Sequence, residues 1–156
     1  MENYSYNPLT QEKCEYPSVL DDRAGIEEFI LLNEGKPIVV VQGLGFVGAV
    51  MSLVCANAIK EDYAVIGIDL VNEATYWKIK SINDGQFPLI AADPKITEFF
   101  ESAKSKGNFY ATYDKSAYSF ADFIIVDINL DVQKSSSINN ILESFDVDLT
   151  GFKKAI

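Results

Sequence analysis

Short apolar runs recur along this chain and are separated by segments whose apolar residues have helical spacing. The runs are rich in β-branched and aromatic residues and have the length of strands, which predicts strands at 38–41, 64–69, 108–112 and 123–128. The first run has no polar alternation, as is typical of a strand buried on both faces of a parallel sheet. The last run is apolar enough to predict a central strand.

Helices are predicted in the intervening segments, at 46–59, 72–83, 93–106 and 114–120. The third helix has the clearest ends, because Asp93 and Pro94 are favoured at an N-terminus and Gly107 is favoured just after a C-terminus. Strand and helix therefore alternate. This order predicts an α/β fold, a Rossmann-like and mostly parallel doubly wound sheet with helices on both faces.

The segment before the first strand is predicted to be an N-terminal extension that covers residues 1–36. Within it, the range 21–32 has the apolar spacing of a short helix, which Asp21 or Asp22 would cap. We expect this helix to cover part of the sheet. The sheet domain itself is predicted at 37–130.

The remaining residues, 131–156, are predicted to form a tail that ends in a helix capped near Asp148. That helix has room for less than two turns, with Phe152 and Ile156 on one face. We therefore expect an N-terminal fragment whose sheet is truncated after the fourth strand. The edge and the apolar face of that strand should be poorly covered, which favours a homo-oligomer.

Three glycines follow the first strand at the spacing of a dinucleotide-binding turn. Gly43 allows the tight turn, Gly45 lets the backbone approach a pyrophosphate, and Gly48 lets the next helix pack on the strand. The helix N-terminus then offers free N–H groups and a partial positive charge to the phosphates. The chain has nine glycines, so this spacing alone is weak evidence, and its position between a strand and a helix strengthens it.

An acidic residue ends the second predicted strand. Asp69 lies 21 residues after Gly48, close to where such folds place a carboxylate that binds the adenosine ribose. A carboxylate there repels a 2′-phosphate and favours NAD over NADP. The alternative interpretation is that Asp69 is a polar strand end or a helix cap.

Composition limits the partners of the chain. A net charge of −10 argues against nucleic acid and against anionic membranes. No apolar stretch reaches transmembrane length and the N-terminus does not resemble a signal peptide, so a cytoplasmic protein is expected. Cys14 and Cys55 suggest neither a disulfide framework nor a metal site, and Cys55 is most simply a core residue. The absence of histidine excludes Ser-His-Asp and Cys-His catalysis.

Several motifs in a fixed order point to a particular family. They read VVVQGLGFVG, VIGID, INDGQFPL, FYATYD and ADFIIVDIN along the chain. This series resembles the N-terminal NAD-binding domain of the UDP-glucose/GDP-mannose dehydrogenase family. The resemblance covers about residues 37–132, and the segment 83–88 is more specific than the glycine loop.

The resemblance implies a set of NAD-binding residues, which are Gly43, Leu44, Gly45, Phe46, Val47, Asp69, Lys78, Thr112, Ile128 and Asn129. The first five match the loop over the pyrophosphate, and Asp69 matches the ribose-binding acid. Lys78 falls where many members have an arginine near the adenosine, although an ordinary solvated helix lysine is an equal alternative. Ile128 and Asn129 fall near the nicotinamide half.

The resemblance also implies a reaction. Members oxidise the C6 alcohol of a UDP-sugar to the uronic acid with two NAD, through a nucleophilic cysteine. That cysteine and the nucleotide-sugar site belong to later domains, and no residue here matches them, so we expect the fragment alone to be inactive. Leu130 and Asp131 stand where the family commonly has Thr-Pro. This departure supports an alternative, a stand-alone NAD(H)-binding or sensing module without dehydrogenase chemistry.

Overall fold

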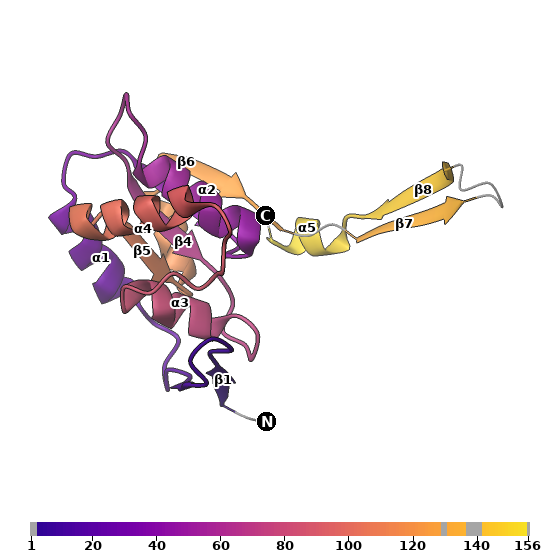
Figure 1. The fold of residues 1–156 in the computed structure, drawn as a ribbon, viewed down its shortest axis with the longest axis horizontal. Coiled ribbons are helices and arrows are strands. Elements are labelled where there is room, and N and C mark those ends of the chain that lie inside the picture. The colour runs from indigo at the N-terminus through magenta and orange to yellow at the C-terminus, as the bar shows by residue number, and fades with distance from the viewer. Residues whose placement is uncertain (1–2, 129–130, 137–141, 156) are drawn as a thin grey trace.

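A parallel sheet of four strands forms the centre of the molecule (Figure 1). The structure is a computed structural model, and it describes residues 3–128, 131–136 and 142–155. The strands are β3 (Ile38–Gln42), β4 (Ala64–Ile68), β5 (Phe109–Thr112) and β6 (Phe123–Val126), and they lie in the order β5-β4-β3-β6. The chain thus moves outward from β3 to β5 and then returns to the other side of β3, which is the order of a Rossmann-like sheet.

The register places alternate residues of β3 and β4 on opposite faces of the sheet. Val39, Val41 and Val65 belong to one core cluster, against which α2 (Phe46–Ala56), α3 (Tyr76–Asn83) and α4 (Pro94–Lys106) pack. On the other face, Val40 and Ile66 pack with residues of α1 (Arg23–Leu32) and of the 3-10 helix η1 (Lys115–Phe120). Helices therefore cover both faces, and the predicted fold class is confirmed.

The N-terminal extension contains a hairpin that the apolar pattern does not reveal. Its strands, β1 (Tyr4–Tyr6) and β2 (Lys13–Glu15), are antiparallel and only three residues long. Asn7 orders the connection, because its side-chain oxygen accepts the N–H of Leu9 at 2.9 Å. The Asn7 amide also donates to Ser81 Oγ at 3.2 Å, which ties the hairpin to α3. The predicted helix of the extension is present as α1 and buries Ile26 against the sheet.

The two edge strands of the sheet are covered to different extents. On β5, the Asn83 amide donates to the Ala111 carbonyl at 2.8 Å and accepts the Ala111 N–H at 2.9 Å, as a neighbouring strand would. Among the described residues β6 pairs with β3 alone, and Phe123 and Ile124 are 54% and 51% exposed. The prediction of a central last strand is therefore wrong, whereas the predicted poor coverage of its edge and apolar face is confirmed.

The tail begins with a second hairpin that projects from the body of the molecule (Figure 1). It consists of β7 (Asp131–Ser136) and β8 (Leu142–Asp148), which are antiparallel. The tail ends in α5 (Thr150–Ala155), and the Asp148 carboxylate accepts the N–H of Thr150 at 2.8 Å, as predicted for a cap. The hairpin was not expected, since its sequence is largely polar and gives no apolar run of strand length.

Local side-chain hydrogen bonds explain two helix boundaries that differ from prediction. The helix predicted at 46–59 ends at Ala56, because Asn57 donates its amide to the Leu53 and Phe99 carbonyls at 2.9 Å each. The helix predicted at 72–83 begins only at Tyr76, because the Asn72 side chain accepts the N–H of Ala74 at 2.9 Å and forms a turn. Within the described residues, no helix has the length and apolar character needed to span a bilayer.

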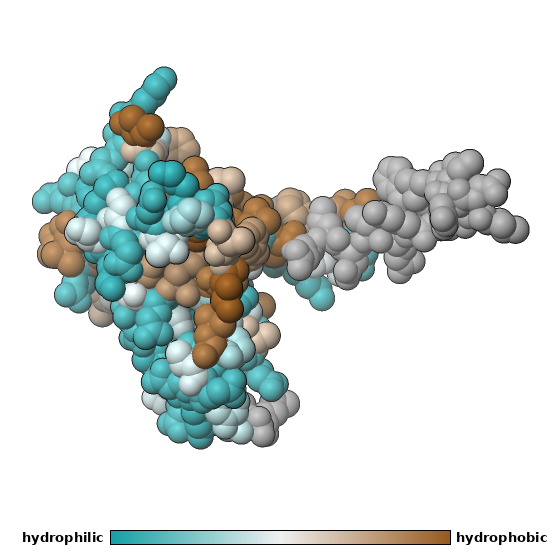
Figure 2. Space-filling view, in the orientation of Figure 1, coloured by the Kyte–Doolittle hydropathy of each residue, from teal (hydrophilic) through white to brown (hydrophobic). Residues whose placement is uncertain are grey.

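Hydrophobic side chains gather on the side of the body from which the β7–β8 hairpin projects (Figure 2). The helix α2 starts at the carboxyl end of β3, and its first two residues, Phe46 and Val47, are 56% and 59% exposed. A large exposed apolar area at the edge of a sheet is typical of a surface that another molecule or domain covers.

Candidate dinucleotide-binding site

The carboxyl ends of β3, β4 and β6 meet at one point. Gly43 donates its N–H to the Ile68 carbonyl at 2.8 Å, and Asp127 donates its N–H to the Gln42 carbonyl at 2.8 Å. Here the strand order reverses, since β4 and β6 lie on opposite sides of β3. Open α/β sheets bind their ligands outside the carboxyl ends of strands at such a reversal.

The three glycines of the turn have different surroundings. Gly43 has a φ of +95°, and a Cβ built on it would collide with the Asp127 carbonyl oxygen. A Cβ on Gly48 would collide with the Gly43 carbonyl oxygen. A Cβ on Gly45 would meet no atom within 4 Å. The first and third glycines are thus required by packing, whereas Gly45 borders open space that a ligand can enter.

The first turn of α2 faces this open space. Gly45 is the N-cap, and its carbonyl accepts the N–H of Ala49 at 3.0 Å as the first helical hydrogen bond. The preceding N–H groups have no partner within the helix, and glycine has no side chain that could cap them. Leu44 is buried, with its side chain against Gly67, so only its backbone is turned toward the site. This arrangement suits an anion such as a pyrophosphate.

The carboxylate of Asp69 is held beside the turn by two backbone groups. Oδ2 accepts the N–H of Leu44 at 3.0 Å, and Oδ1 accepts the N–H of Leu70 at 2.8 Å. A carboxylate oxygen can accept a further hydrogen bond, so both oxygens remain able to bind ligand hydroxyls. Asp69 is therefore fixed relative to the glycine turn, as a ribose-binding acid needs to be.

A cavity of about 500 Å³ opens in front of these residues. It brings together Gly43, Asp69 and Ile128 of the predicted site. Two lysines line it as well, Lys115 of η1 and Lys154 of α5. The sequence did not predict either lysine, because neither belongs to a motif. In addition, the β7–β8 hairpin separates α5 from the last strand of the sheet along the chain. A wall with a carboxylate and two ammonium groups suits a ligand with both hydroxyls and anionic groups.

Other predicted residues lie away from this cavity. Thr112 is fully buried, and its hydroxyl donates to Asp22 Oδ2 at 2.6 Å and accepts the N–H of Asp114 at 3.1 Å. Lys78 lies on α3 and is not part of the lining. Phe46 and Val47 stand at the open start of α2, and Asn129 lies outside the described residues.

Asp22 of the extension is an unpredicted centre of hydrogen bonding. Besides Thr112, it accepts the hydroxyl of Tyr110 at 2.9 Å, while its own N–H donates to Asp114 Oδ2 at 2.9 Å. Burial, together with the nearby Asp22 carboxylate, raises the pKa of Tyr110 well above its ordinary value. Asp22 is the N-cap residue of α1, but its side chain makes no capping hydrogen bond and binds Tyr110 of β5 instead.

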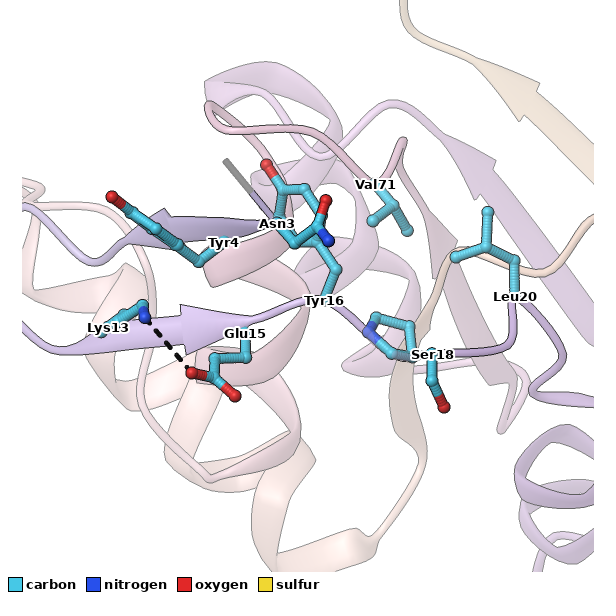
Figure 3. A pocket seen from close by; sticks show the side chains of 9 residues that line it. Asn3, Tyr4, Lys13, Glu15, Tyr16, Ser18, Leu20 and Val71 are labelled. Atoms are coloured by element: carbon cyan, nitrogen blue, oxygen red, sulfur yellow. Dashed lines mark hydrogen bonds and ion pairs between the residues drawn. The ribbon is translucent and has the colours of Figure 1, made fainter. Parts of the chain in front are cut away.

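A second cavity, of about 620 Å³, lies between the β1–β2 hairpin and Val71 (Figure 3). Val71 follows Asp69 by two residues. This cavity adjoins the same loop as the first but is lined mostly by the N-terminal extension.

A parallel sheet with a reversal of strand order, a glycine turn before a helix and a fixed acid after the next strand define a dinucleotide-binding domain of the Rossmann type. The sequence profile of the UDP-glucose/GDP-mannose dehydrogenase family, NAD binding domain, matches residues 37–155. The chain therefore belongs to this family, and its cofactor is NAD. The open space at Gly45 and the position of Asp69 fit that cofactor.

Two solved structures have a similar fold. An NDP-N-acetyl-D-galactosaminuronic acid dehydrogenase from Methanosarcina mazei Go1 is 22% identical over 83% of this chain, with a TM-score of 0.58. A UDP-D-ManNAc dehydrogenase from Pyrococcus horikoshii is 24% identical over 76% of this chain, with a TM-score of 0.54. The chain spans about a quarter of each, 26% and 24% of their lengths. No curated protein sequence matches this chain.

Proposed function

We propose that this chain is the NAD-binding domain of an NAD-dependent dehydrogenase that oxidises the C6 alcohol of a UDP-sugar to the uronic acid with two NAD. The observation that supports it best is the pairing of Asp69 with the glycine turn through the N–H of Leu44. NAD supplies the hydride acceptor when bound. The residues of this chain bind and orient it.

The proposed roles follow the positions of the residues. The N–H groups at the start of α2, over Gly45, bind the pyrophosphate, and Asp69 binds the hydroxyls of the adenosine ribose. Ile128, which lines the same cavity beyond β6, is assigned to the nicotinamide side, and Asn129 is assigned to it by the family resemblance alone. Thr112 acts indirectly, because its hydroxyl orders the backbone on either side of Tyr113, which lines the cavity.

Neither cysteine of the chain is suited to the nucleophilic step. Cys14 is 3% exposed in β2, and Cys55 is half-buried in α2. Burial raises the pKa of both thiols, which disfavours the reactive thiolate. Neither one lines the 500 Å³ cavity. We therefore propose that the sugar substrate and the catalytic cysteine belong to further domains and that residues 1–156 alone are inactive.

The alternative is a stand-alone NAD(H)-binding or sensing module. It is favoured by the segment 127–132, which departs from the family pattern after β6. The coding sequence after Ile156 distinguishes the two. An in-frame continuation with a cysteine in a sugar-binding domain supports the dehydrogenase, whereas a stop codon at that point supports the module.

The same proposal places the protein in the cytoplasm as a homo-oligomer. Two free cysteines suit a reducing compartment, and the exposed apolar face of β6 suits a contact between copies. Titration calorimetry with NAD tests the central claim. Saturable binding of NAD supports it, and no heat of binding at millimolar NAD would refute it.

A further inference from the structure

The 620 Å³ cavity is divided between apolar and polar ends. Figure 3 shows Leu20 and Val71 at one end and the ion pair of Lys13 with Glu15, 3.2 Å long, at the other. The apolar end adjoins the loop that follows Asp69. Except for Val71, the lining comes from the extension, which precedes the segment matched by the family profile.

A row of tyrosine rings joins this cavity to the 500 Å³ cavity. The centroids of Tyr16 and Tyr76 are 5.6 Å apart at an interplanar angle of 82°. Those of Tyr76 and Tyr113 are 6.1 Å apart at 54°. Tyr16 lines the first cavity and Tyr113 lines the second. The three rings come from the extension, from α3 and from the segment after β5, so a row of aromatic contacts runs from the lining of one cavity to the lining of the other.

Each of the two cavities is lined by an exposed leucine. Leu20 is 64% exposed and Leu70 is 65% exposed, and each lines one of the two cavities. A single exposed leucine is ordinary. Leu70 directly follows the carboxylate proposed to bind ribose, and Leu20 lines its cavity together with Val71, the next residue along that loop.

We propose that residues 16–20 of the N-terminal extension form one wall of the binding site for the adenine ring of NAD, with Leu20 and Val71 in contact with the ring. This inference rests on the proposed function. With the ribose on Asp69, the base lies one glycosidic bond away, and Val71 lies two residues away, within about 7 Å along an extended chain. Leu20, Val71 and Tyr16 give this lining the apolar and aromatic contacts that a planar heterocycle prefers, beside polar side chains such as Asn3 and Ser18.

The test compares two leucine variants by calorimetric titration with NAD and with AMP, which carries only the adenosine half. Leu20→Ala removes apolar contact with the ring, and we expect it to weaken both ligands by about three- to tenfold. Leu32→Ala is the matched control, because Leu32 is 76% exposed on α1 and lines neither cavity. It should change neither affinity. The melting temperature of both variants should equal that of the wild type, since both side chains are exposed.

Asp69→Ala separates the inference from the proposed function. If Asp69→Ala weakens NAD while Leu20→Ala binds NAD and AMP like the wild type, the extension does not contact adenine and the NAD site stands. If the wild type binds neither NAD nor AMP, the proposed function fails and the inference fails with it.

Discussion

The carbonyl oxygen of Asp127 occupies the space that a side chain on Gly43 would need. The end of β6 thereby closes over the turn that follows β3, and Gly43 meets this constraint with a φ of +95°. Two residues later, Gly45 has no such neighbour. Of these two glycines, the fold requires Gly43 to lack a side chain, whereas only a bound ligand would require this of Gly45.

Alanine at these two positions should give opposite results. We expect Gly43→Ala to lower the free energy of unfolding by about 2 kcal/mol or more, because of the collision and the unfavourable φ. Gly45→Ala should melt like the wild type but bind NAD at least about tenfold more weakly, since its methyl group enters the pyrophosphate site. Thermal unfolding and calorimetric titration measure the two effects. Wild-type NAD affinity in Gly45→Ala would show that the pyrophosphate passes elsewhere.

Asp69 should set both the affinity for NAD and the preference over NADP. Asp69→Ala removes the carboxylate that we propose accepts hydrogen bonds from ribose hydroxyls and repels a 2′-phosphate, so NAD should bind roughly 10- to 100-fold more weakly and discrimination should relax. Glu73→Ala is a suitable control, because it removes an exposed carboxylate from the same loop. Competition titrations with both cofactors report the ratio. Equal selectivity in Asp69→Ala and the wild type would make Asp69 only a strand-end residue.

The hydrogen bond between Tyr110 and Asp22 should make folding sensitive to alkali. The raised pKa keeps the Tyr110 phenol protonated in the folded state, while in the unfolded chain it ionises near its ordinary value of 10.0. Stability is therefore fully present below that pH and is lost as the pH rises above it. Burial shifts the pKa of Tyr118 in the same direction. Urea unfolding from neutral pH to about pH 11 should show the decline.

Tyr110→Phe tests the origin of that decline. It removes a donor to a carboxylate, so the free energy of unfolding at neutral pH should fall by about 1–3 kcal/mol. It also removes the titrating phenol. Above the ordinary pKa of tyrosine, the variant should therefore lose less of its free energy of unfolding than the wild type does. An equally steep alkaline decline in the variant would assign the effect to other groups.

The sequence was sufficient to predict the local geometry of the glycine turn and the position of Asp69 at a strand end, because these signals are local. The glycine turn and Asp69 follow directly from apolar strands, and the structure fixes them together through the N–H of Leu44. The hydroxyl of Thr112 is different, since its direction is set by Asp22, which lies 90 residues earlier in the chain. Neither the apolar periodicity nor a motif can predict a contact between residues that lie so far apart in the chain.

The other features that the sequence did not predict depend on contacts between distant parts of the chain or on segments too short to show a pattern. Lys154 lines the cavity from α5, which follows a largely polar hairpin that the apolar pattern does not predict. The β1–β2 hairpin has three-residue strands and depends on the side chain of Asn7. Strands of that length are too short for an alternating pattern to stand out. The exposure of β6 is a property of the whole sheet, because its sequence alone resembles that of a central strand.

The uncovered face of β6 should drive self-association. Ile124 pairs in register with Val40, on the face that α1 and η1 cover elsewhere, yet it is 51% exposed. Light scattering should therefore show a mass that rises with protein concentration. Ile124→Lys places a charge on this face and should shift the protein toward the monomer, since desolvating a lysine at an apolar contact is costly.

The matched control for that prediction is Leu32→Lys, which places the same charge on α1, where Leu32 is 76% exposed. It should leave the association unchanged, because α1 lies away from the open edge of the sheet. Both variants should keep the melting temperature of the dissociated protein, as neither side chain is buried. A wild-type protein that stays monomeric at high concentration would contradict the prediction, and so would equal effects of the two lysines, which would point to net charge instead.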